Sequence, residues 1–228
     1  MNHEQLALVR GWDDTRATLR AWRARPVPVV GAWALASLGV AVLLLVSTWV
    51  VALRSVPDPL LIVRTGTGEW DDFGFILYRN GLVLGLHAMA CVAGFMAGST
   101  LPVAASGYSA WWQRVHARAG RLAMAFVAAA TLFSLGTQAY ALGTQASDVA
   151  YANGVSPALL IVSLLPHAVP ELCALFLPLA AWILAARRKA WEELLAATLV
   201  TAAVAAPVLV ASAAVEVWLS PHVLYFLK

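Results

Sequence analysis

Residues 29–53 read VVGAWALASLGVAVLLLVSTWVVAL, a stretch without a single charged side chain. A helix rises 1.5 Å per residue, so this stretch is long enough to cross a hydrocarbon core of about 30 Å. A lipid-exposed segment must satisfy its own backbone hydrogen bonds, which a helix does. The stretch therefore predicts a transmembrane helix. It is much longer than the apolar part of a signal peptide, and no convincing cleavage site follows, so we expect a retained anchor.

The composition of the whole chain agrees with a membrane protein. Of its 228 residues, 61% are hydrophobic and 12% are charged, about half the usual charged share of a soluble protein. A soluble fold of this size could not bury so much apolar surface. The two cysteines, Cys91 and Cys173, both lie in apolar runs, which argues against a disulfide scaffold. The chain is predicted to be an all-α, polytopic transmembrane helix bundle.

Five stretches have the length and apolar character of membrane spans. The fourth contains Pro166, Pro170 and Pro178, so we expect it to be kinked or partly unwound. The spans are predicted over about residues 29–53, 74–101, 122–143, 155–186 and 194–219, within a transmembrane domain of residues 28–228.

Basic residues predict the orientation, because cytoplasmic loops carry an excess of lysine and arginine. Eleven of them fall on one side of the five-span pattern (Arg10, Arg16, Arg20, Arg23, Arg25, Arg114, Arg118, Arg121, Arg187, Arg188, Lys189) and three on the other (Arg54, Arg64, Lys228). This places the N-terminus in the cytoplasm and the C-terminus outside. Topology thus explains the net charge of +3, and no nucleic-acid partner is expected.

Residues 1–27 precede the first span and carry one apolar stripe. Leu8, Trp12, Thr15, Leu19 and Trp22 recur at steps of three and four residues, which places them on one face of a helix. Such a helix is predicted to lie in the cytoplasmic headgroup layer. The alternative is a docking face for a cytoplasmic partner helix.

Ionisable side chains inside a membrane span are costly, and they indicate function by default. Arg79 and Glu216 are placed in the outer third of their spans, where we expect an ion pair. His87, His167 and Glu171 are placed near the middle of the membrane. His167 and Glu171 stand four residues apart, so they share one face if that turn is helical.

Three interpretations of this polar cluster stay open. It can be a buried network that fixes the register of the helices. It can be a recognition site for a partner helix or a translocated group. It can also be a metal site in which His87, His167 and Glu171 hold zinc or a similar ion that activates water for intramembrane hydrolysis. No cofactor is expected under the first two interpretations.

The second span contains two pairs of small residues at helical spacing, Gly81 with Gly85 and Gly94 with Gly98. Small residues at this spacing let helix backbones approach closely in lipid. We expect them to pack against helices of the same chain more often than to form a homo-oligomer interface.

Three segments together resemble the stage II sporulation protein M family. Residues 165–174, LPHAVPELCA, look like the family's Pro-His-Gly-x-x-Glu-Leu-x-Ala motif, with Ala168 where members usually carry glycine. Residues 214–221, AVEVWLSP, are similar to its closing Ile-Glu-x-x-x-x-Pro segment. Residues 78–81, YRNG, followed by Gly94 and Gly98, resemble its asparagine-led span.

The resemblance implies a five-helix integral protein of the bacterial cytoplasmic (inner) membrane, and it points to Asn80, His167, Glu171 and Glu216 as the positions of interest. The family's namesake works with peptidoglycan-degrading partners in a membrane complex. We therefore expect a non-enzymatic scaffold bound to envelope proteins such as peptidoglycan hydrolases. The alternatives are the metal-dependent hydrolase and a transporter subunit, which would need an ATPase partner for active transport.

Overall fold

The structure is a computed structural model, and it describes residues 3–60, 67–100 and 109–227; the side chains of residues 3–11, 99–100, 110, 112–121, 123–124 and 127 lie outside the description. Its elements are α1 (His3–Ala24), α2 (Pro26–Arg54), α3 (Trp70–Phe95), η1 (Met96–Thr100), α5 (Ala110–Ala152), α6 (Pro157–Arg188), η2 (Trp191–Glu193), α7 (Leu194–Ala214), η3 (Val215–Leu219) and α8 (Ser220–Leu227). The described residues contain no strand, so the all-α prediction is confirmed.

Four helical stretches in the described part are long and apolar enough to cross a membrane. They are Pro26–Arg54, Trp70–Gly98, Pro157–Arg188 and Trp191–Leu227. They contain the first and fifth predicted spans and cover most of the second and fourth, so the chain is a multi-pass membrane protein by length and composition. The third predicted span, residues 122–143, lies inside α5, where several side chains are outside the description.

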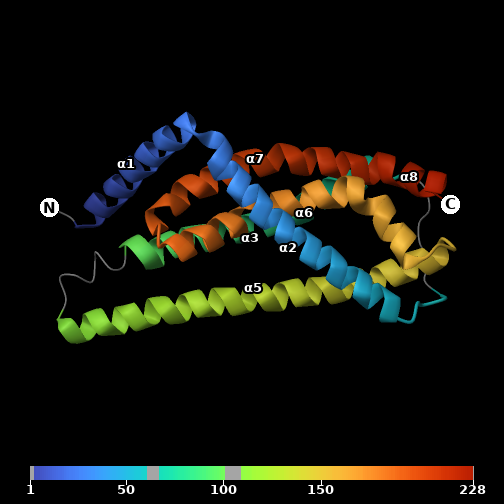
Figure 1. Cartoon of the computed structure of the whole chain (residues 1–228), viewed down its shortest axis with the longest axis horizontal. Helices are drawn as coiled ribbons and strands as arrows, with labels where there is room; N and C mark the ends of the chain where they lie inside the picture. Colours follow the sequence, from blue (N-terminus) through green and yellow to red (C-terminus); the bar gives the residue numbers. More distant parts are fainter. Residues whose placement is uncertain (1–2, 61–66, 101–108, 228) are drawn as a thin grey trace.

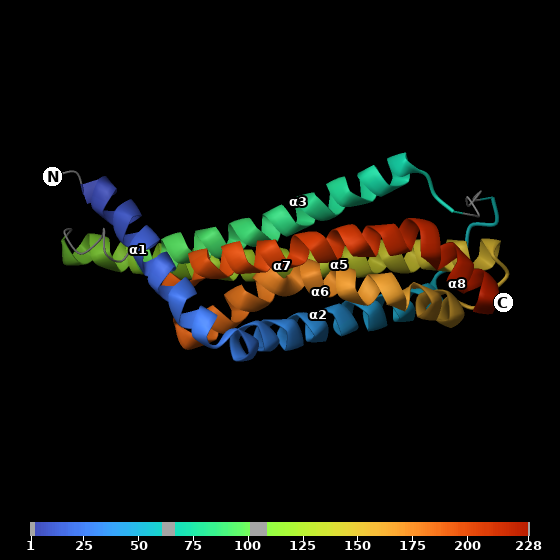
Figure 2. The same cartoon turned by 90° about the horizontal axis from the view of Figure 1, so that it is seen from above.

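The five long helices run alternately in opposite directions, and the two ends of the chain lie at opposite ends of the molecule (Figure 1). Helix α6 is the most buried of the candidate spans and packs against α2, α3, α5 and α7. Helix α3 diverges from α7 toward its own N-terminal end (Figure 2). There the indole of Trp218 in η3 bridges the gap, with ring centroids 4.8 Å from Trp70 and 5.2 Å from Phe73.

Helix α5 is nearly twice as long as the predicted span. Its 43 residues extend roughly 65 Å at 1.5 Å per residue, more than twice the thickness of a hydrocarbon core. No proline interrupts the sequence between Ala110 and Ala152, so the basic segment before the predicted span continues the helix. The helix ends at Asn153, and Gly154 follows in the left-handed conformation (φ 66°). One end of α5 projects beyond the other long helices (Figure 1).

Helix α6 is kinked, as its prolines predict, but it is not unwound. It starts at Ser156, whose side chain accepts a hydrogen bond from the Leu159 amide at 3.2 Å, and it runs unbroken to Arg188. Pro166, Pro170 and Pro178 all lie inside it. The helix bends sharply in its first half (Figure 1), which is where a proline ring pushes away the preceding turn.

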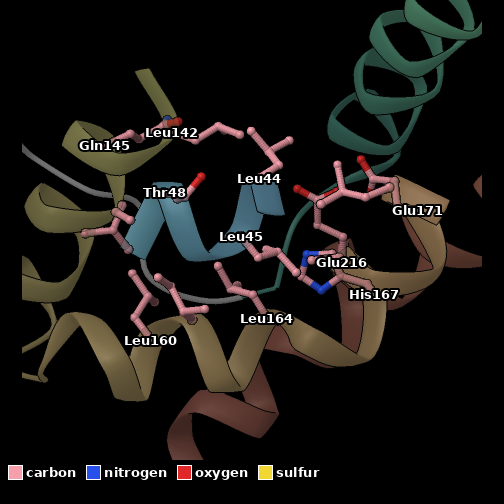
Figure 3. Close-up of a pocket in the computed structure, with 15 residues that line it drawn as sticks. Leu44, Leu45, Thr48, Leu142, Gln145, Leu160, Leu164, His167, Glu171 and Glu216 are labelled. Atoms are coloured by element: carbon pink, nitrogen blue, oxygen red, sulfur yellow. The ribbon is translucent and has the colours of Figure 1, made fainter. Parts of the chain in front are cut away.

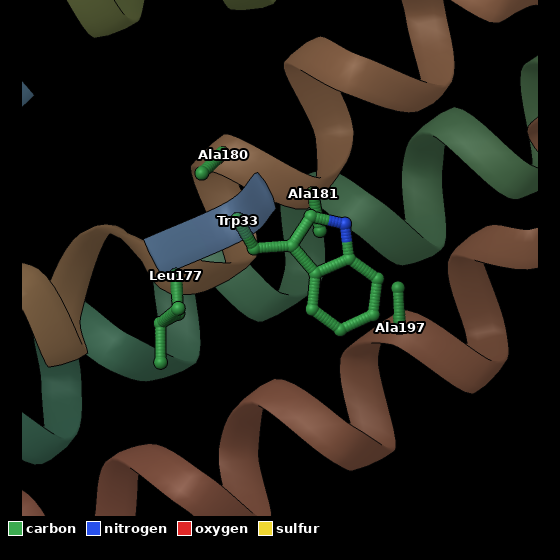
Figure 4. Packing of buried hydrophobic residues seen from close by; sticks show 5 residues of the cluster. All are labelled: Trp33, Leu177, Ala180, Ala181 and Ala197. Atoms are coloured by element: carbon green, nitrogen blue, oxygen red, sulfur yellow. The ribbon is translucent and has the colours of Figure 1, made fainter. Parts of the chain in front are cut away.

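One core cluster consists of a large ring packed against alanines. Trp33 is 2% exposed and packs on Leu177, Ala180, Ala181 and Ala197 (Figure 4). The small alanines of α6 and α7 leave the space that the indole of α2 fills. Trp22 of α1 meets Trp33 edge to face, with ring centroids 5.1 Å apart.

The predicted apolar stripe of α1 is partly buried against the rest of the chain and partly exposed. Thr15 is buried and Leu19 and Trp22 are half-buried, whereas Trp12 is 52% exposed. Helix α1 packs against α7 and η2, so part of the stripe is covered by the chain itself. The side chain of Leu8 lies outside the description. Placement in the headgroup layer stays a prediction.

The two glycine pairs of α3 behave differently. A Cβ atom at Gly94 would lie 2.7 Å from Trp182 Nε1 and 2.9 Å from Leu194 Cδ1, and one at Gly98 would collide with the ring of Trp191. Those two glycines therefore pack within the chain, as expected. Gly81 and Gly85 have no atom within 4 Å of an added Cβ and lie on the exposed face of α3.

Candidate functional site

Asn80 and Glu171 join α3 to α6. The Asn80 amide, 8% exposed, donates a hydrogen bond from Nδ2 to Glu171 Oε1 at 3.0 Å. Both residues come from the segments that resemble a known family, and they stand 91 positions apart in the chain. A buried carboxyl group needs such a donor, because an unmade hydrogen bond in an apolar environment is costly.

His167 and Ser220 join α6 to the start of α8. His167 is 5% exposed, and its Nδ1 lies 2.6 Å from Ser220 Oγ. The Ser220 hydroxyl also lies 3.2 Å from the Val215 carbonyl oxygen. A hydroxyl can donate only one hydrogen bond. If Ser220 donates to the Val215 carbonyl, Nδ1 of His167 must carry a proton and donate to Ser220. If Ser220 donates to His167, Nδ1 must be the unprotonated acceptor.

A π-helical turn, η3, carries Glu216 and interrupts the helix between α7 and α8. Such turns occur mostly as single-turn interruptions and are frequent at functional sites. The carboxylate of Glu216 is half-buried and lies close to His167, and Glu171 lies nearby (Figure 3). Within the described residues, Glu216 makes no hydrogen bond or ion pair.

These three residues form one end of a cavity of about 340 Å³ between α2, α5 and α6. Its volume falls at the lower end of the range of small-molecule sites. Leucines and other apolar residues of α2, α5 and α6 form most of the remaining wall, and Thr48 and Gln145 are its other polar residues. The Thr48 hydroxyl is buried and has no hydrogen-bond partner among the described residues. The cavity thus combines an apolar body with an acidic end.

His87 lies apart from this cavity. Its Nδ1 donates to the Leu175 carbonyl oxygen at 2.8 Å, and nearby Cys91 Sγ donates to the Pro178 carbonyl oxygen at 3.0 Å. Both bonds join α3 to the α6 backbone beside Pro178. The predicted metal ligands are therefore not one set. In the described part of the chain, no three His, Cys, Asp or Glu side chains are arranged to hold a metal ion.

Arg79 does not form the expected ion pair. Its side chain is exposed, and its guanidinium carbon lies 5.8 Å from the ring centroid of Phe75, one turn earlier on α3. Among the described residues, no ion pair links it to Glu216. The next residue, Asn80, is the buried one that faces α6, so Arg79 lies on the exposed side of α3.

The resemblance singled out four positions, and three of them, His167, Glu171 and Glu216, line the cavity. The fourth, Asn80, is hydrogen-bonded to Glu171. Sequence reasoning missed Thr48, Gln145 and Ser220. Hydroxyl and amide side chains are common in membrane helices, and no local spacing marks these three as neighbours of the acidic pair. Only the packing of α2, α5 and α8 against α6 reveals them.

Comparison of the chain with protein-family models, with curated proteins and with solved structures finds no match.

Proposed function

We propose that this chain is a non-enzymatic, five-span scaffold of the bacterial cytoplasmic membrane that holds envelope-remodelling proteins in a complex. The observation that carries the proposal is how the in-membrane polar groups are used. Asn80 bonds Glu171, His167 bonds Ser220 and His87 bonds the α6 backbone, so each joins two helices. Polar groups used in this way fix the positions of helices.

The alternating helices support five crossings with the N-terminus inside. An odd number of crossings is needed for chain ends on opposite sides, and Figure 1 places the ends at opposite ends of the bundle. The basic residues cluster on the side where α1 lies. On this orientation the projecting end of α5 reaches into the cytoplasm.

The link to envelope remodelling is supported by the resemblance to the stage II sporulation protein M family. Asn80, His167, Glu171 and Glu216, which carry much of that resemblance, lie in one region of the bundle. Residues that share a motif and also a place in the structure are a stronger indication than a sequence pattern alone. We propose peptidoglycan hydrolases as partners on this basis.

Photo-crosslinking in the native membrane tests the scaffold. A photoreactive residue replaces Leu86 on α3 or Phe133 on α5, which are 67% and 74% exposed. The expected result is a discrete product with a second envelope protein from at least one position. Ala180, which is 0% exposed, is the control and should give crosslinks within the chain only. Lipid adducts alone at both outer positions would contradict the proposal.

The cavity favours a second candidate, a ligand-binding membrane subunit of a transporter. Register-fixing contacts do not require a 340 Å³ space with an unpartnered carboxylate and an unpartnered hydroxyl. Flux measured with reconstituted chain, alone and with a co-purified ATPase, separates this candidate from the scaffold. The geometry does not favour the metal-dependent hydrolase, since His87 lies apart from the other two proposed ligands, His167 and Glu171.

A further inference from the structure

We propose that the cavity binds a single-chain amphiphile whose head is a primary ammonium group and whose hydrocarbon chain lies along the leucine wall. The inference rests on the second candidate function and names its ligand class. Three features carry it: the formal charge at the acidic end, the polar groups without partners, and the apolar body of the cavity.

The formal charge at the acidic end favours a cation. Glu171 and Glu216 line that end, and no lysine or arginine is among the described residues that line the cavity. A carboxylate removed from water needs a partner, so a ligand with a positive charge completes the set.

The unused polar groups suit a hydrogen-bond donor. Glu171 accepts one hydrogen bond from Asn80, and Glu216 accepts none from the described residues. An ammonium group has three donors and no acceptor. It can bond both carboxylates and leave one donor for the Thr48 hydroxyl or the Gln145 side chain, which line the same cavity.

The apolar body distinguishes an amphiphile from an inorganic ion. Leu44, Leu160 and Leu164 line the cavity beyond the acidic end and offer no oxygen ligand (Figure 3). A cation such as Ca²⁺ needs six to eight oxygen ligands, which this wall does not supply. A hydrocarbon chain instead gains close contacts with the leucines.

The cavity is also accessible from the side. Leu142 is 38% exposed, and Leu45 and Leu164 are half-buried, so the wall is not closed at the meeting of α2, α5 and α6. An amphiphile dissolved in the surrounding lipid can enter by this route without crossing the bundle. A soluble amine without a chain would lose that advantage.

Binding of radiolabelled dodecylamine to the full chain in lipid nanodiscs tests the inference. Laurate and dodecanol have the same chain length with an anionic and a neutral head, and empty nanodiscs give the lipid background. We expect saturable retention of about one dodecylamine per chain, with both other probes at background. Equal retention of the three probes would identify an apolar crevice without head-group selectivity and overturn the proposal. Retention of dodecylamine at background level would overturn it as well.

Matched variants locate the site. Glu216→Gln keeps the size of the side chain and should weaken dodecylamine binding about tenfold or more. Glu193→Gln is the control, because that carboxylate pairs with Arg188 at 3.8 Å in η2, away from the cavity. Binding that survives Glu216→Gln unchanged would overturn the proposal. If that variant does not fold, Thr48→Val, which removes the unpartnered hydroxyl, should weaken binding several-fold, and unchanged binding would overturn it equally.

The experiment is independent of the crosslinking and flux measurements. Flux of another solute without dodecylamine binding would uphold the transporter candidate and reject this ligand class. Dodecylamine binding without flux would uphold the ligand class and reject transport.

Discussion

Asn80 is an amide in a helix made largely of apolar side chains, and its bond to Glu171 fixes the height at which α3 meets α6. Asn80 is buried and Glu171 is half-buried, so each has few other partners. Interhelical hydrogen bonds in membranes are worth about 0.6 kcal/mol on average and up to about 1.7 kcal/mol, because the unfolded chain also finds partners.

The Asn80–Glu171 pair should show measurable coupling. We expect a double-mutant cycle of Asn80→Ala and Glu171→Ala to give about 1 kcal/mol in the free energy of unfolding, measured by titration with denaturing detergent. Gln138→Ala is the control, because Gln138 bonds only Ser134 within α5. A coupling near zero would show that the two residues contribute independently.

Trp33 contributes by filling space. In lipid the exposed state of a side chain is also apolar, so the loss on truncation comes from missing contacts and an unfilled void. We expect Trp33→Ala to lower the free energy of unfolding by roughly 3 kcal/mol, the lower end of the range for large aromatic truncations. Trp49→Ala on the same helix, where the ring is 40% exposed, should cost much less. Equal losses would mean that the α2–α6–α7 contact does not depend on this indole.

At the scale of elements, two hydrogen bonds tie α3 to the α6 backbone beside Pro178. His87 donates to the Leu175 carbonyl oxygen, and Cys91 donates to the Pro178 carbonyl oxygen. Side-chain donors of one helix thus bond backbone acceptors of the next, which helps to fix α3 against α6.

Helix α5 depends on one glycine for its contact with α2. A Cβ atom at Gly143 would lie 2.8 Å from the Thr48 carbonyl oxygen and 2.6 Å from Val51 Cγ1, so the two backbones meet there. That contact also forms one side of the cavity, which Thr48 lines.

Gly143→Val should separate α5 from α2. We expect the distance between spin labels on the two helices to increase, and the free energy of unfolding to fall by about 1–3 kcal/mol, because neither backbone can yield. Gly136→Val on the same helix has no atom within 4 Å of the added Cβ and should change neither quantity by much. An unchanged distance for Gly143→Val would show that α5 is held elsewhere.

At the scale of the whole molecule, the outer surface is apolar and the interior contains the hydrogen-bonded polar groups. Exposed leucines, phenylalanines and methionines cover α3 and α5, for example Leu82, Met89 and Phe126. In water this surface would drive aggregation. In a bilayer it faces lipid, so burial of apolar surface does not hold the helices together, and close packing and hydrogen bonds must do so.

The proposed orientation predicts which residues a membrane-impermeant thiol reagent reaches. In a Cys91→Ala, Cys173→Ala background, Leu60→Cys should react from outside intact cells, since Leu60 is 86% exposed after the first span. Glu192→Cys, at an exposed position of η2 just before α7, should react only after permeabilisation. The reverse pattern would show that the N-terminus lies outside.

The sequence by itself determined the class of the molecule. Apolar runs of span length, such as residues 29–53, admit only helices in lipid, because the backbone has no other way to satisfy its hydrogen bonds. Four candidate spans could be predicted for this reason, and the kink of α6 could be predicted from its prolines. The extent of α5 could not, since continuing a helix beyond the bilayer changes no hydrophobic pattern.

Only the tertiary structure decided which polar residues meet. Depth within a span placed Arg79 beside Glu216, but depth does not specify direction around a helix, and Arg79 lies on the exposed side of α3 near Phe75. The same limit applies to His87, which bonds the α6 backbone and not the His167–Glu171 pair. The cavity with Thr48 arises where three helices meet. Such a site depends on crossing geometry, and the order of residues along each helix does not encode that geometry locally.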